Sequence, residues 1–182
     1  GQHILNTAYK DLEKLLEEDY ERVVYLGSSS LYGIAKESAL KLLELTSGKI
    51  ISKCESILGF RHGPKSIIND KTLIFVYLSE DKYSRKYDID LLDEIYNDPG
   101  KHQVITISKE RIDELVNKSD YHFSLDQDLN NIDNLGFISL LYVLYAQVFA
   151  LLSSVKVGMQ PDNPNPTGLI NRVVKGVTIY PY

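Results

Sequence analysis

The sequence has a single cysteine and no excess of positive charge. Cys54 alone cannot form an internal disulfide or a zinc site of several thiolates, which favours the reducing cytoplasm over a small secreted scaffold. Twenty Lys and Arg against 25 Asp and Glu give a net charge of -5, so no basic field would gather nucleic acid. Any anionic ligand must therefore be held by a local site.

The N-terminal residues lack the basic segment and apolar run of a secretory signal, and we expect none. The stretch from Leu135 to Val155 carries no charge and is long enough to cross a bilayer. A lone lipid-facing span has no use for a stripe of small or polar side chains, so we predict a helix buried on all sides, between a sheet and another layer or subunit, and no membrane partner. That stripe recurs at three- and four-residue steps and comprises Gly136, Ser139, Val143, Gln147, Ala150 and Ser154.

The length of 182 residues, with 43% hydrophobic positions, suits one globular domain. Short β-branched or aromatic runs alternate with helical patterns, which is typical of βαβ units. Runs such as VVYL and TLIFVYL lack polar alternation, so they fit central parallel strands covered on both faces. We predict a three-layer α/β/α sandwich around a five-stranded parallel sheet, with an N-terminal helix within residues 4–19 and a tail over residues 158–182. The expected strands are 23–26, 49–54, 72–78, 103–108 and 121–125, and the expected helices are 34–46, 83–96, 110–116 and 135–155.

Ligands of open parallel sheets bind beyond the carboxyl ends of the strands, so the loop after the first strand is a candidate site. Ser28, Ser29 and Ser30 stand there, after Gly27. The loop matches neither a dinucleotide fingerprint nor a P-loop, and we expect no cofactor. Three hydroxyls at a helix N-terminus suit a phosphate or a sugar hydroxyl. The alternative is that these serines only cap the helix.

The helix after that loop places Glu37, Lys41 and Glu44 on one face. A solvated ion-pair face is one interpretation. The other is chemical, because a carboxylate can take a proton from carbon beside an ammonium that stabilises the resulting oxyanion. Apolar residues of this helix are expected to pack on the sheet, namely Ile34, Ala35, Leu40, Leu42, Leu43 and Leu45.

A third candidate is the segment Phe60-Arg61-His62-Gly63-Pro64-Lys65-Ser66. Pro64 suits the first position of a helix that Gly63 caps. Arg61, His62 and Lys65 then gather at a helix start, which is unfavourable unless an anion or a carboxylate offsets them. His62 either caps a turn or moves a proton near neutral pH.

No metal site is expected. The run from Asp126 to Asn130 imitates a calcium loop, but Asn131 stands where glycine is needed and Phe137 where glutamate is needed. No two histidines have the spacing of a metal-binding pair on a helix.

Three separated motifs, in order, resemble a sugar isomerase (SIS) domain from about Glu21 onward. They are VVYLGSSSLYGIAKESALKLLELT, GFRHGPKS and RVVKGVTI, which resemble the second SIS domain of glucosamine-6-phosphate synthase. Three sequence segments resemble more closely the tagatose-6-phosphate ketose/aldose isomerase family, also described as galactosamine-6-phosphate deaminase/isomerase. These segments are KLLELTSGK, LGFRHGPKS and YSRKYDIDLL. The resemblance implies a flavodoxin-like SIS fold and the second half of a protein with two SIS domains.

The resemblance also implies roles for particular residues. Glu44 is the base that moves a proton between C1 and C2, and Lys41 holds a carboxylate or the enediolate oxygen. His62 assists opening of the sugar ring and, in the synthase, reaches the neighbouring subunit's site, which implies a homodimer. Lys175 meets the sugar near its reacting end. We assign Glu37, Arg61, Ser28, Ser29 and Ser30 to substrate binding.

These expectations define a metal-independent, cytoplasmic sugar-phosphate isomerase or amino-sugar-phosphate deaminase. The phosphate would be held mainly by a first SIS domain. The alternative is a sugar-phosphate-sensing SIS module, which needs no base and usually follows a DNA-binding helix-turn-helix that residues 1–20 are too short to form. A purely structural role, in dimerisation or in covering a catalytic neighbour, is a third possibility.

Overall fold

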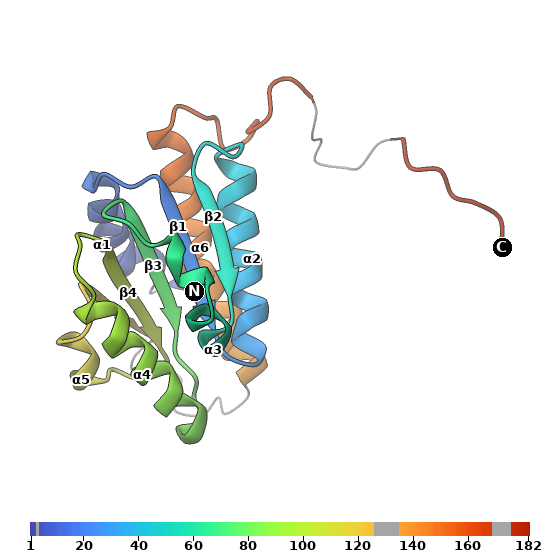
Figure 1. The fold of residues 1–182 in the computed structure, drawn as a ribbon. Coiled ribbons are helices and arrows are strands. Elements are labelled where there is room, and N and C mark those ends of the chain that lie inside the picture. The colour runs from blue at the N-terminus through green and yellow to red at the C-terminus, as the bar shows by residue number, and fades with distance from the viewer. Residues whose placement is uncertain (3, 126–134, 169–175) are drawn as a thin grey trace.

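The computed structural model describes residues 1–2, 4–125, 135–168 and 176–182. Their five strands form one sheet in the order β2-β1-β3-β4-β5, and every neighbouring pair is parallel. Helices cover both faces of this sheet (Figure 1). The predicted α/β/α architecture is therefore confirmed. The strands are β1 (Arg22–Gly27), β2 (Ile51–Glu55), β3 (Thr72–Tyr77), β4 (Gln103–Ser108) and β5 (Tyr121–Ser124).

Alternate residues of the inner strands enter two separate cores. In β3, Phe75 and Tyr77 face one core, whereas Ile74 and Val76 face the other. Every residue of β3 is buried, while the edge strand β2 is only half-buried. The uninterrupted apolar runs thus mark strands with a hydrophobic layer on each side.

The first core packs the sheet against α2 (Ser30–Leu45), α6 (Leu135–Lys156) and the N-terminal helical segments. Stacked aromatic rings fill its centre, with Tyr25 and Phe75 centroids 5.0 Å apart. The predicted N-terminal helix exists as three short pieces, η1 (Ile4–Ala8), α1 (Tyr9–Lys14) and η2 (Leu15–Glu17). The second core lies under α3 (Ile57–Arg61), α4 (Lys82–Asn97) and α5 (Asp113–Val116).

The chain between α3 and β3 forms the short helix η3 (Pro64–Ile67). Gly63 caps it at a φ of 129°, in the region that favours glycine, and Pro64 occupies its first turn. This agrees with the sequence expectation for the pair.

Within this chain, the helix α6 is buried on one side, and cover of its other side by a subunit stays a prediction. Phe137, Leu140 and Val155 are each more than 60% exposed, and Leu151 is also exposed. Ala146, Phe149 and Ser153 on the other side are fully buried. Residues 136–156 are long and apolar enough to cross a membrane, and 56% of their most apolar window is buried inside the fold. One face of α6 belongs to the core, and the opposite face has no cover among the residues that the structure describes.

The expectation that Leu40 and Leu43 pack on the sheet is wrong. Both side chains are exposed, at 43% and 46%, while Ala35 and Leu42 of the same helix are fully buried. The helical repeat explains the difference, because residues at 100° steps cannot all face one layer. The exposed leucines of α2 and the exposed apolar row of α6 occur on two helices that pack against each other.

The turn from β1 to α2 is unusually tight. A Cβ atom on Gly27 would lie 2.5 Å from the Leu31 carbonyl oxygen, so only glycine fits there. Ser29 has a φ of 51°, an uncommon conformation for a side-chain-bearing residue. The helix consequently begins at Ser30, four residues earlier than expected.

Candidate active site

Lys41 and Glu44 line a cavity of about 670 Å³ at the C-terminal end of α2. The Lys41 ammonium donates to a Glu44 carboxylate oxygen at 2.7 Å and lies 3.5 Å from Glu37. Both side chains remain partly exposed, at 30% and 42%. The volume lies within the range of small-molecule sites, so the pair has room for a ligand beside it.

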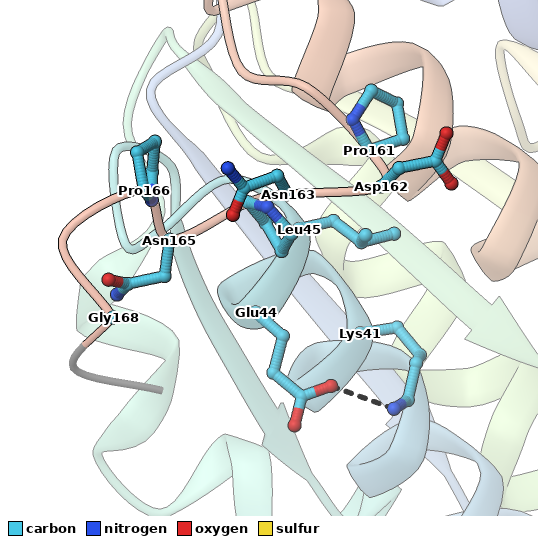
Figure 2. A pocket seen from close by; sticks show the side chains of 10 residues that line it. Lys41, Glu44, Leu45, Pro161, Asp162, Asn163, Asn165, Pro166 and Gly168 are labelled. Carbon is cyan, nitrogen blue, oxygen red and sulfur yellow. Dashed lines mark hydrogen bonds and ion pairs between the residues drawn. The ribbon is translucent and has the colours of Figure 1, made fainter. Parts of the chain in front are cut away.

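The other wall of this cavity, hereafter the Lys41–Glu44 pocket, comes from the segment that follows α6. Figure 2 shows that segment crossing the end of α2 near Lys41 and Glu44. A hydrogen bond from the Lys49 ammonium to the Val157 carbonyl, at 2.8 Å, ties the end of α6 to the turn after α2. The lining residues of the segment are Pro161, Asp162, Asn163, Pro164, Asn165, Pro166 and Gly168.

Among the described residues that line the Lys41–Glu44 pocket, one cation, Lys41, stands with the carboxylates of Glu44 and Asp162, and Glu37 lies 3.5 Å from Lys41. The hydrogen bond from Lys41 to Glu44, aided by the negative charges of Glu44 and Glu37, holds the pKa of Lys41 above its ordinary value. Lys41 therefore stays positive throughout the neutral range. A carboxylate beside a permanent cation can accept a proton from carbon while the cation stabilises the oxyanion that forms.

The serine loop lies at the other end of α2. Glu44 follows Ser30 by 14 residues, which at the rise of a helix separates them by about 21 Å. Ser28 and Ser29 line a second cavity, of about 350 Å³, and neither lines the first. Ser29 occupies the N-cap, but its side chain makes no capping hydrogen bond to α2. Capping alone thus does not account for this serine.

Arg61 and Lys65 lie against α4, on the opposite side of the sheet from α2 (Figure 1). The Arg61 guanidinium contacts Asp90 and Glu94, each at 2.7 Å, and Lys65 pairs with Glu94 and Asp98. Carboxylates offset these cations, which is one of the two outcomes that the sequence left open. The substrate-binding role of Arg61 remains a prediction.

His62 is exposed at the C-cap of α3, and it does not line the Lys41–Glu44 pocket. Lys175 lies outside the described residues, as does the calcium-like run from Asp126 to Asn130. Within the described part of the chain, no group of three His, Cys, Asp or Glu side chains is placed to hold a metal ion. The structure thus unites Lys41, Glu44 and Glu37, but not these three with His62 or the serines.

Sequence reasoning missed the amide-bearing part of this site. Asn163 and Asn165 line the Lys41–Glu44 pocket, and their side chains can donate and accept hydrogen bonds. The available signal was the alternation of asparagine with proline in residues 160–166. It predicted a tail without indicating what the tail contacts.

The five-stranded parallel sheet between two helical layers makes the chain a three-layer α/β/α domain (Figure 1). Residues 16–154 match the SIS domain family, and the chain belongs to that family. Over 182 residues it is 40% identical to the D-galactosamine-6-phosphate deaminase AgaS of Shewanella sp. strain ANA-3. The fold matches the tagatose-6-phosphate ketose/aldose isomerase of Escherichia coli with a TM-score of 0.81 and 39% identity, and this match covers the whole chain.

A Clostridium novyi protein, proposed to be a tagatose-6-phosphate ketose/aldose isomerase, is similar at 46% identity and a TM-score of 0.93 over 98% of this chain. The chain spans less than half the length of these relatives. It covers 43% of the Shewanella protein, 45% of the E. coli structure and 46% of the C. novyi structure.

Proposed function

We propose that this chain supplies the base-bearing SIS domain of a sugar-phosphate isomerase or amino-sugar-phosphate deaminase. The observation that carries the proposal is the Lys41–Glu44 pair in a ligand-sized pocket under the tail. The names of the similar proteins support a substrate of the galactosamine 6-phosphate or tagatose 6-phosphate type.

In the isomerase reaction, Glu44 removes the proton from C2 of the open-chain aldose and returns it to C1. The electrons of the broken C–H bond pass into an enediolate, whose oxygen Lys41 stabilises. The proton of the C2 hydroxyl, or of the C2 amine in an amino sugar, passes to the C1 oxygen, so that C1 becomes a hydroxymethyl group. In the deaminase reaction the same transfer on a 2-amino sugar gives an imine at C2. Water adds to that imine, ammonia leaves, and the ketose remains.

The remaining roles complete this proposal. His62 assists ring opening from a neighbouring copy of the chain, so it need not contact Glu44 within one copy. Lys175 meets the sugar at its reacting end. Residues 176–182 are exposed and carry apolar Val177 and Ile179, which supports a tail that packs in the assembled protein.

We also propose the larger organisation. The chain is one SIS domain over residues 1–182, the C-terminal half of a cytoplasmic protein with two such domains, and it forms a homodimer. This chain covers only 43% of the Shewanella relative, and one apolar face of α6 is uncovered. Both observations support a further domain or a second copy that packs on this face of α6. The first SIS domain would hold most of the phosphate.

A sensing module without catalysis is the second candidate. The cavity at Ser28 and Ser29 is lined by hydroxyls and apolar groups, with no carboxylate among its lining residues. Such a cavity can bind a sugar without any base. The two candidates differ in whether the protein turns over a substrate.

The deciding experiment incubates the intact protein with galactosamine 6-phosphate and follows ammonia and ketose together. Ketose with equimolar ammonia identifies the deaminase. Interconversion of tagatose 6-phosphate with its aldose, without ammonia from the amino sugar, identifies the isomerase. If neither reaction occurs while the sugar phosphates still bind, the enzymatic proposal is wrong and the sensing module is favoured.

A further inference from the structure

The direction of the His62 side chain depends on the backbone that carries it. His62 is exposed, and no residue that the structure describes forms a hydrogen bond or an ion pair with its imidazole. It follows α3, which Ile57 and Phe60 anchor in the second core. It precedes Gly63, whose φ is 129° and whose backbone is the least restricted of any residue type. The placement of the imidazole therefore depends on what holds the chain on either side of His62.

One carboxylate of α4 holds the chain on both sides of His62. Arg61, directly before His62, donates from Nε to Glu94 Oε2 at 2.8 Å. Lys65, three residues after His62, donates to the other oxygen of the same carboxylate, Oε1. Glu94 thus bridges the two ends of residues 61–65, hereafter the His62 loop.

Two further carboxylates extend this bridge. The Arg61 guanidinium also contacts Asp90 at 2.7 Å, and the Lys65 ammonium contacts Asp98 at 2.6 Å. Asp90, Glu94 and Asp98 follow one another at four-residue steps, so they lie on one side of the helix and its end. Single exposed ion pairs hold little, but a network that includes an arginine shared between two carboxylates holds a defined geometry. Four ion pairs attach the His62 loop to α4.

The helix to which the loop is attached is itself firmly packed. Leu91, Leu92 and Ile95 of α4 are buried in the second core. The hydrogen bond from Lys65 lowers the pKa of Glu94 from its ordinary value, so the bridging carboxylate stays charged at neutral pH. The loop is therefore held against a rigid element under the conditions in which the protein works.

We propose that Glu94 is a positioning residue for His62, and that it acts through Arg61 and Lys65. This role rests on the proposed function, in which His62 assists ring opening in the site of a neighbouring copy. A group that transfers a proton must lie within hydrogen-bond reach of the reacting atom, and small displacements of such a group lower the rate steeply. Loss of Glu94 frees the His62 loop to move at Gly63, so the imidazole spends less time in place.

The first test measures amide hydrogen exchange in the intact protein carrying Glu94→Gln. We expect the amides of His62 and Ser66, which are hydrogen-bonded to nearby carbonyls, to exchange about threefold to tenfold faster. The amides of β3 report global unfolding and should change less. The control is Asp93→Asn, which removes the neighbouring carboxylate of α4 that pairs with Lys118 at 2.9 Å. Exchange in the His62 loop that is unchanged, or that rises only as much as in β3, overturns the inference.

The second test is a double-mutant cycle on kcat, with galactosamine 6-phosphate or tagatose 6-phosphate, whichever the intact protein converts. We expect Glu94→Gln to lower kcat about threefold to tenfold and Asp93→Asn to keep the parental value. In a protein that already carries His62→Ala, Glu94→Gln should cause no further loss, because the group that Glu94 positions is absent. A merely structural role would lower kcat by the same factor with and without His62, and that result overturns the inference.

The outcomes separate this role from the proposed function. If His62→Ala is slow and Glu94→Gln has the parental kcat, the proposed function stands and the positioning role is wrong. If Glu44→Gln keeps the parental kcat, the base is wrongly assigned, and the cycle between Glu94 and His62 still decides the positioning role. If His62→Ala keeps the parental kcat, or if neither sugar phosphate is converted, the ring-opening role is wrong and the positioning role falls with it.

Discussion

Lys41 and Glu44 contact each other because of their spacing alone, since residues three apart lie on the same side of a helix. The sequence therefore predicted the pair, and the structure adds its 2.7 Å hydrogen bond. The sequence could not predict that Asn163 and Asn165 line the same pocket as the pair, because the pocket brings together segments more than 110 residues apart. Local spacing determines the pair, whereas long-range packing of the chain determines the pocket.

For a single residue, the tight turn at Gly27 predicts how a substitution changes thermal stability. A methyl group there collides with the Leu31 backbone, so Gly27→Ala should cost about 2 kcal/mol and lower Tm by about 4–8 °C. Gly33→Ala is the control, because a Cβ on Gly33 meets nothing within 4 Å. Within a helix that change should leave Tm unchanged or raise it. Equal Tm values in a thermal unfolding series would contradict the tight turn.

The ion pairs of Glu94 predict that the stability of the fold depends on pH. The hydrogen bond from Lys65 holds the pKa of Glu94 below its ordinary value of 4.5, with Arg61 adding to the effect. A lowered acid pKa contributes stability above pH 4.5, and that stability is lost as pH falls through the folded-state value. The partly exposed cluster is worth about 0–1 kcal/mol.

The corresponding measurement is urea unfolding between pH 7 and pH 3. Glu94→Gln should destabilise the protein at pH 7 and should make its stability fall less on acidification than in the parent. Glu110→Gln, at an exposed position, is the control and should follow the parent curve. Parallel curves for the parent and Glu94→Gln would show that this cluster does not stabilise the fold.

At the scale of the element, α2 carries different chemistry at its two ends. Its first turn follows the serine loop, and its last turns carry Lys41 and Glu44. A ligand the size of a hexose cannot contact both ends, because they are about 21 Å apart. Two separate sites, or a site completed by another domain, are the arrangements compatible with this helix.

The apolar row of α6 predicts an interface. Leu140→Asp places a charge on the uncovered face, where Leu140 is 62% exposed. In the intact protein we expect a lower Tm or a smaller sedimentation coefficient, since a buried unpaired charge disrupts packing. Val116→Asp, at a 39% exposed position on the other layer, is the control. Wild-type values of both quantities for Leu140→Asp would mean that solvent, not protein, covers this face.

The sequence predicted the sheet of the whole molecule well, because uninterrupted apolar strands between helical patterns leave few topologies other than a covered parallel sheet. It was wrong about Leu40 and Leu43, which are exposed, and one face of α6 has no cover among the described residues of this chain. Apolar residues serve a core or an interface equally well, and composition does not tell which. Within one chain, the described residues bring Lys41 and Glu44 together but do not bring His62 to them, and Lys175 lies outside the described residues. The proposed site therefore depends on the proposed assembly, in which His62 comes from a neighbouring copy.

The most direct measurement compares kcat of the intact protein and its Glu44→Gln variant on galactosamine 6-phosphate or tagatose 6-phosphate, whichever the intact protein converts. Removal of the base should lower kcat by about 10²- to 10⁴-fold. The control is Glu114→Gln, which breaks a similar lysine–glutamate contact, of 2.6 Å to Lys118, on the opposite layer. The account predicts near-parental kcat for Glu114→Gln and a large loss for Glu44→Gln. Equal kcat values for all three proteins would contradict it.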